Sequence, residues 1–207
     1  MHFEALSPQA IKSITQRSLL LEWNELARGR RFPALSGFHP DAGLHDPAQL
    51  IIWNVEHDGG TRRFRACYQG RYLAEAFNAS WVGRTLDTVV PDCLRPFVLE
   101  TANECVDSRC AVFSILSTLD IAGHRVDCER LLLPFGRDGE IVEQVVASVQ
   151  LISLKGSFDR KTVLQRYQQG LEITVAGRIS AGFARPPIAT SAGAGALVEL
   201  GPAAKFR

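Results

Sequence analysis

Residues 50–86 constrain the fold of this 207-residue chain more than any other stretch. The stretch opens with an apolar run, Leu50 to Val55, of the length and composition of a buried strand. The turn Asp58-Gly59-Gly60 follows, where glycine supplies the positive φ that a tight hairpin needs. A second strand with alternating polarity comes next, and we expect one of its faces to carry Phe64, Ala66 and Tyr68.

The hairpin should lead into short helices. Gly70 ends the second strand, and helical spacing then relates Tyr72, Leu73, Ala76 and Phe77. A longer helix should run from Pro91 to about Ser108. Three further strands are predicted at Ala111–Thr118, Arg125–Phe135 and Ile141–Leu154. The order of two strands, helices and three strands predicts an α+β fold, with a five-stranded antiparallel sheet and helices over one face.

The chain divides into five predicted segments. They are an N-terminal amphipathic helix (1–32), a connecting loop (33–49), the α+β domain (50–154), a C-terminal helix with a short extended piece (155–179) and an Ala/Gly/Pro-rich tail (180–207) that we expect to be flexible.

The N-terminal helix allows two interpretations. It should begin at Ser7-Pro8, and it has apolar residues at positions i, i+4 and i+7, namely Leu19, Trp23 and Leu26. Either these three residues pack on their own domain, or they form the interface with a second subunit or a partner. The last predicted strand has one apolar and one half-polar face, and the half-polar face is expected to receive this helix or another subunit.

Composition excludes some classes of protein. Lys and Arg total 23 against 22 Asp and Glu, so we expect no general binding to nucleic acid, which needs many cations on phosphate. No apolar run reaches the roughly 20 residues of a membrane span. The first residues lack the pattern of a secretory signal, and the five cysteines show no CxxC spacing. These features favour a cytoplasmic protein that does not bind membranes.

Catalytic and metal motifs are weak. The loop HPDAGLHD contains His39 and His45, but a flexible turn-rich loop is a poor metal scaffold, so we predict no metal site. There is no GxSxG motif, and Asp127 and Glu129 alternate with apolar residues as a solvent-facing pair would. We therefore expect no enzyme, with a small hydrolase using His39 or His45 as a remote alternative.

A set of ordered motifs resembles a known family. The residues are Trp23, Leu26, Arg28, Gly29, Arg31, Pro33, Pro40, the strand Leu50–Val55, Phe64-Arg65, Gly70 and Gly83-Arg84-Thr85-Leu86. Over roughly residues 19–153 they resemble the single-domain bacterial PAS proteins of the PAS_5 family. The resemblance implies a PAS sensory or regulatory fold, often a homodimer, with a cleft between the sheet and its helices.

The resemblance does not imply a ligand. The Asn-Cys-Arg-Phe-Leu motif of flavin-binding light sensors is absent, and the helix from Pro91 to Ser108 lacks the histidine ligand of haem-binding PAS domains. Flavin and haem are therefore disfavoured, and the cofactor is left open. The predicted ligand-binding residues are those expected to point between sheet and helices: Phe64, Tyr68, Tyr72, Phe77, Phe97, Val98 and Arg130. The competing interpretation is that these residues are ordinary core.

We accordingly expect a cytosolic PAS-type sensor that binds a small molecule in the cleft and signals through a partner protein. The alternative is a ligand-free module for dimerisation and protein interaction.

Overall fold

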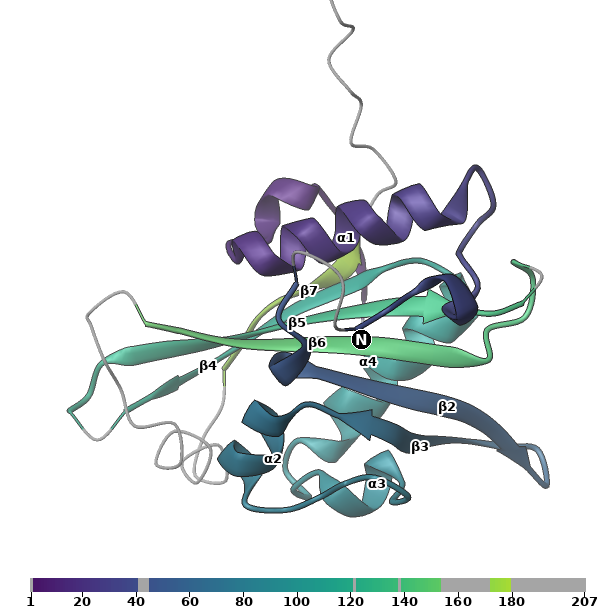
Figure 1. The fold of residues 1–207 in the computed structure, drawn as a ribbon. Coiled ribbons are helices and arrows are strands. Elements are labelled where there is room, and N and C mark those ends of the chain that lie inside the picture. Colours follow the sequence, from purple (N-terminus) through teal and green to yellow (C-terminus); the bar gives the residue numbers. More distant parts are fainter. Residues whose placement is uncertain (1, 41–44, 121, 138, 154–171, 180–207) are drawn as a thin grey trace, which may run out of the picture.

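The computed structural model describes residues 2–40, 45–120, 122–137, 139–153 and 172–179. These residues form an α+β fold (Figure 1). Its strands are β1 (Glu4–Leu6), β2 (Leu50–Asp58), β3 (Thr61–Gln69), β4 (Val112–Leu119), β5 (Arg125–Phe135), β6 (Gln144–Ser153) and β7 (Glu172–Ile179). Its α-helices are α1 (Ile14–Ala27), α2 (Arg71–Phe77), α3 (Leu86–Val89) and α4 (Arg95–Ser108). Short 3-10 helices are η1 (Pro8–Ala10), η2 (Leu35–Gly37) and η3 (Pro47–Gln49).

The sheet has seven strands in the order β1-β7-β4-β5-β6-β2-β3. The five expected strands are its neighbouring members β4-β5-β6-β2-β3, and all of their pairings are antiparallel. The expectation of a five-stranded, purely antiparallel sheet is nevertheless wrong. β7 pairs with the free edge of β4, and β1 then pairs with β7 in parallel, so the sheet is mixed. A strand of three residues such as β1 leaves almost no periodic signal in the sequence.

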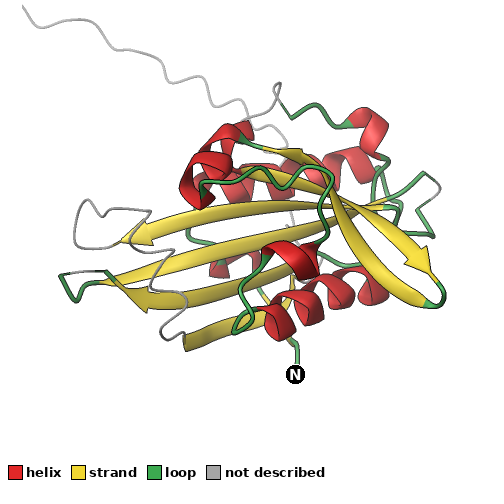
Figure 2. Cartoon of the chain, turned by 90° about the horizontal axis from the view of Figure 1, so that it is seen from below, coloured by secondary structure: helices red, strands yellow, loops and turns green. Residues whose placement is uncertain are grey.

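Helices cover both faces of the sheet. In Figure 1, helices α2 and α3 lie below the sheet and α4 runs behind it, and in Figure 2 all three are seen in front of the sheet. Helix α1 lies on the opposite face, where the side chain of Gln16 donates to the carbonyl oxygens of Glu129 at 3.2 Å and Ser148 at 3.0 Å. The half-polar face of β6 therefore receives the N-terminal helix of the same chain.

Helix α1 begins later than expected. Ser7 caps the 3-10 helix η1, and Ser13 caps α1 by accepting from the backbone N–H of Gln16. The helix ends where Arg28 adopts a left-handed conformation with φ of 48°. Because an α-helix has about 3.6 residues per turn, starting at Ile14 instead of Pro8 shortens the predicted helix by less than two turns.

The three residues expected at a subunit interface lie inside the chain. Leu19 is 1% exposed and Trp23 is 5% exposed, and the indole Nε1 of Trp23 donates to the carbonyl oxygen of Pro134 on β5 at 2.8 Å. Leu26 is partly buried and packs against the same core. Apolar spacing on a helix cannot distinguish its own sheet from a partner. Here the sheet covers Leu19 and Trp23, so this part of the interface prediction is corrected.

The acidic pair on β5 is also buried, contrary to expectation. Glu129 is 0% exposed, and its carboxylate accepts from the backbone N–H groups of Ser13 at 3.1 Å and Lys12 at 3.4 Å. Asp127 accepts from Lys12, Arg125 and Ser117. Alternation predicts that both residues share a face, but it does not reveal that the start of α1 covers that face.

The two carboxyl groups respond oppositely to their surroundings. Burial raises the pKa of Glu129 above its ordinary 4.5, only partly offset by the backbone donors of Ser13 and Lys12. Burial also pushes the pKa of Asp127 upward, but the hydrogen bonds from Arg125, Ser117 and Lys12 outweigh it and leave that pKa below 3.8. Glu129 is therefore easier to protonate in the folded chain than in the unfolded chain, and Asp127 is harder.

These opposite shifts predict the pH dependence of two variants. As pH rises above 4.5, unfolded Glu129 ionises before native Glu129, so the wild-type chain loses stability until the native pKa is passed. Glu129→Gln should lack this loss, and the difference should be about 1.4 kcal/mol for each unit of pKa shift. Asp127→Asn, the control, should lack the stability that wild type loses as pH falls below 3.8. Urea unfolding of both variants across this acid range measures the two slopes, and equal slopes would contradict the assignment.

The predicted C-terminal helix and flexible tail lie outside the described residues, whereas the short extended piece contains strand β7. Within the described part of the chain, no helix combines the length and apolar character that crossing a membrane requires.

Candidate ligand-binding cavity

A cavity of about 480 Å³ lies between the sheet and helices α2, α3 and α4. Its floor is formed by the inward-facing residues of five strands: Ile51, Trp53, Phe64, Leu116, Cys128, Arg130, Leu132, Val145, Ala147 and Val149. Its roof runs from the end of α2 to the first half of α4: Ala76, Phe77, Asn78, Ala79, Trp81, Arg84, Leu86, Thr88, Val89, Val90, Pro91, Leu94, Val98 and Ala102. The volume and the mainly apolar lining are typical of sites for small molecules, which usually measure about 300–1,000 Å³.

Three aromatic side chains form one wall of the cavity. The ring centroids of Trp53 and Trp81 are 6.1 Å apart, and those of Phe77 and Trp81 are 4.3 Å apart. Gln69 at the end of β3 fixes the loop that carries Trp81: its Oε1 accepts from the backbone N–H of Trp81 at 2.6 Å, and its Nε2 donates to Ala79. The β2–β3 hairpin therefore positions one side of the aromatic wall through Trp53, and the loop that Gln69 holds positions the other side through Trp81.

The roof is tied to the edge of β3. The backbone of Ala66 donates to the carbonyl oxygen of Arg84 at 3.0 Å and accepts from Gly83 at 2.8 Å, and Arg65 forms an isolated bridge with Thr85. Gly83 has a φ of 82°, in the region that favours glycine. The Gly83-Arg84-Thr85-Leu86 motif thus marks the place where the chain leaves β3 pairing to enter α3.

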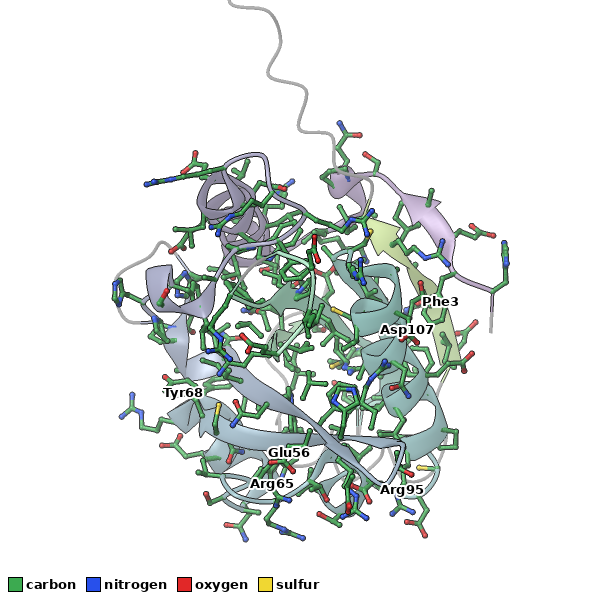
Figure 3. All side chains as sticks on the ribbon, turned by 90° about the vertical axis from the view of Figure 1, so that its right-hand side faces the viewer. Phe3, Glu56, Arg65, Tyr68, Arg95 and Asp107 are labelled. Atoms are coloured by element: carbon green, nitrogen blue, oxygen red, sulfur yellow. The ribbon has the colours of Figure 1, made fainter. Side chains whose placement is uncertain are left out.

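Helix α4 is fixed from two sides. Arg62 on β3 donates to Asn103 at 3.0 Å and to Asp107 at 2.7 Å, and Asp107 stands on α4 in Figure 3. On the other side, Arg178 of β7 pairs with Glu104. The first half of α4 lines the cavity, so the helix connects the cavity to the edge strand β3 and to β7 near the opposite edge.

Arg130 is the one charged residue in the described floor of the cavity. It is 9% exposed, its Nη1 donates to the hydroxyl of Thr101 at 3.4 Å, and its guanidinium carbon lies 6.0 Å from the centre of the Phe97 ring. Its neighbour across the β4–β5 ladder is Ser114, whose buried hydroxyl has no hydrogen-bond partner within the described residues. A polar corner therefore interrupts an otherwise apolar sheet face.

The structure brings four of the seven predicted ligand-binding residues to the cavity: Phe64, Phe77, Val98 and Arg130. Tyr72 packs against the core outside the described lining, and Phe97 is buried beside Arg130. The aromatic residues Trp53 and Trp81 were missed. Trp53 could have been found from the alternation of β2, whereas Trp81 lies in a loop where no periodicity applies.

Tyr68 points away from the cavity, contrary to prediction. Trp53 pairs with Ala66, but Ile52 pairs with Tyr68, so Cys67 is an extra residue in a β-bulge. Beyond the bulge the side chains change faces, and Tyr68 shares the face of Ile52. Its hydroxyl donates to the carbonyl oxygen of Pro47, and Figure 3 shows it at the far end of the hairpin from Arg65.

The histidine considered as a metal ligand or a base has structural contacts. The ring of His45 lies between Glu22, whose carboxylate is 2.9 Å from Nδ1, and the carbonyl oxygen of Pro40, 2.8 Å from Nε2, and it stacks on Phe38. Among the described residues, no group of three or more histidine, cysteine or acidic side chains is arranged to hold a metal ion.

Burial raises the pKa of the Cys105 thiol well above its ordinary value, so this thiol stays protonated in the core.

Compared with models of protein families and with curated proteins, the sequence matches none of them.

Proposed function

We propose that the chain is a PAS-type sensory or regulatory protein, as the PAS_5 resemblance implies, and that it binds a small molecule in the cavity. The observation that carries the proposal is the cavity of about 480 Å³ between the sheet and helices α2 to α4. A well-packed core leaves few voids larger than a water molecule, so a space of this size suits a ligand better than it suits a purely structural domain. In this role the chain is a cytosolic homodimer that acts on an unidentified signalling protein and needs no catalytic residue.

Helix α4 is the element through which binding would act. Val98 and Ala102 face the cavity, whereas Glu104 and Asp107, further along the helix, pair with β7 and β3. A ligand that packs against the first half of α4 therefore acts on the helix that joins β3 to β7. The alternative, a ligand-free dimerisation module based on the N-terminal helix, is weakened because Leu19 and Trp23 are already buried in the chain.

A cavity-filling variant tests the proposal. Ala147 lies in the floor on β6, and Ala147→Phe should occupy the cavity with little loss of stability, because the new ring enters empty space. Wild type should bind members of a small-molecule panel, measured by native mass spectrometry and by the shift of thermal unfolding, and the variant should lose that binding. Ala102→Leu fills the cavity from the opposite wall and serves if the first variant does not fold.

The absorbance spectrum of the purified full chain, recorded with its native mass, reports any retained cofactor and the number of subunits. If wild type binds nothing in the panel, or if both filled variants bind as wild type does, the cavity is not a ligand site and the proposal fails.

A further inference from the structure

The ionisable groups of the cavity are unevenly distributed in sign. Among the 24 described residues that line it, those with ionisable side chains are Arg84, Arg130 and Cys128, and none is a carboxylate. Arg130 stands in the floor, and Arg84 is an exposed residue of the roof whose Nη2 donates to the carbonyl oxygen of Thr88. One buried cation in a mainly apolar space, with a second cation exposed in the roof, favours a ligand that carries negative charge.

The position of Arg130 suits recognition of a carboxylate. A guanidinium is planar and presents its donors as a fork that matches the two oxygens of a carboxylate. Thr101 and the Phe97 ring hold the side chain on the side of α4. Arg130 is mostly buried, so its charge is screened by salt less than a surface charge would be. Ser114, the cross-strand neighbour of Arg130, adds a buried hydroxyl on the same sheet face.

The aromatic wall indicates the rest of the ligand. Trp53, Phe77 and Trp81 all line the cavity, and the ring of Trp81 pairs with the rings of both Trp53 and Phe77. Such a cluster favours another flat ring, because aromatic rings attract each other in offset or tilted arrangements beyond the effect of buried area. A cavity of about 480 Å³ accommodates a molecule of up to about sixteen non-hydrogen atoms, if each takes about 30 Å³, the space of a water molecule in the liquid.

We propose that the cavity binds a small aromatic carboxylic acid, whose carboxylate accepts hydrogen bonds from Arg130 and whose ring packs on Trp53, Phe77 and Trp81. This inference rests on the proposed function, since it takes the cavity to be the ligand site. Arg84 contributes at the entrance, where an exposed cation raises the rate at which anions arrive.

Three indole compounds of nearly equal size test the charge requirement. Calorimetric titration of the full chain would use indole-3-acetate, its neutral amide and the cationic tryptamine. The acid should bind about ten- to hundredfold more tightly than the amide, the usual effect of a hydrogen bond to a charged group. Tryptamine should bind more weakly still, because its ammonium would approach Arg130.

The variant Arg130→Met tests whether Arg130 causes the preference for the acid over the amide. Methionine keeps an unbranched apolar side chain, so binding of the acid should fall at least tenfold while binding of the amide is unchanged or improved. Arg130→Lys keeps the positive charge but not the forked donors, so its affinity for the acid should lie between those of wild type and Arg130→Met. Arg84→Met removes the second lining cation: it should slow association, mainly at low salt, and lower the preference for the acid by less than Arg130→Met does. If Arg130→Met does not fold, the wild-type preference among the three compounds and the Arg84→Met result still decide whether the cavity prefers a carboxylate.

The outcomes separate the two proposals. Amide or amine binding as tight as acid binding overturns the carboxylate assignment and leaves the cavity as a ligand site. Binding of only non-aromatic ligands from the wider panel, blocked by Ala147→Phe, overturns the aromatic acid alone. Absence of binding by every compound overturns both.

Discussion

Trp23→Ala is expected to lower the free energy of unfolding by about 4 kcal/mol, within the range of about 3–5 kcal/mol for truncating a buried Trp. The residue is 5% exposed between α1 and the sheet, so its removal leaves a large void between α1 and β5. It also deprives the carbonyl oxygen of Pro134 of the indole donor at 2.8 Å. Urea unfolding monitored by circular dichroism measures the change.

Two further variants of α1 separate the contributions. Trp23→Phe keeps much of the apolar bulk but removes the hydrogen bond, and should cost about 1–3 kcal/mol. Leu21→Ala is the control: Leu21 is 41% exposed on the same helix, so the loss should stay within about 0.5 kcal/mol. If Trp23→Ala unfolded like wild type and only dissociated a dimer, α1 would be a subunit interface after all.

Gly70→Ala is expected to destabilise the fold by about 3 kcal/mol or more, at the upper end of the cost of overpacking. Gly70 precedes α2 with a φ of −64°, which any residue can adopt, so the constraint is space. A Cβ there would lie 2.3 Å from the carbonyl oxygens of both Pro47 and Ala48. Both are backbone atoms, so the η3 segment or α2 must move. Chemical unfolding gives the loss of stability.

Because α2 carries part of the cavity roof, Gly70→Ala should also weaken any ligand that the wild-type cavity binds. Gly37→Ala is the matched control: its Cβ would meet only the side chain of Leu26, at an ordinary 3.6 Å. Equal stability of the two variants would mean that the close approach at Gly70 relaxes without cost.

The central sheet and part of the cavity were predictable because periodicity reports local geometry directly. The strand Arg125–Phe135 follows from its pattern between two turns, and α4 ends at the predicted Ser108. The placement of Phe64 and Arg130 on one sheet face follows from alternation within regular strands. These residues lie where the sheet is regular, so the alternation of side chains along each strand is sufficient to predict which face they occupy.

The remainder depended on events that a local pattern does not record. One extra residue at Cys67 turns Tyr68 to the other face, and nothing in the alternation marks the insertion. Glu129 alternates like a surface residue, but a segment more than a hundred positions earlier covers it. Trp81 lies in a loop that a hydrogen bond from its backbone to Gln69 fixes in place, and such a contact leaves no periodic pattern in the sequence.

The pairing of β1 with β7 makes the order of synthesis matter. Glu4 is synthesised before strands β2 to β6, but its partner Gly177 emerges only after all of them. Until then the backbone of β4 is an open edge, a template on which a second nascent chain can pair. A chain that stopped at Leu154, where the sequence suggests a domain boundary, would keep that edge exposed permanently. Strand β7 therefore covers the edge of β4 and holds β1 in the sheet at the same time.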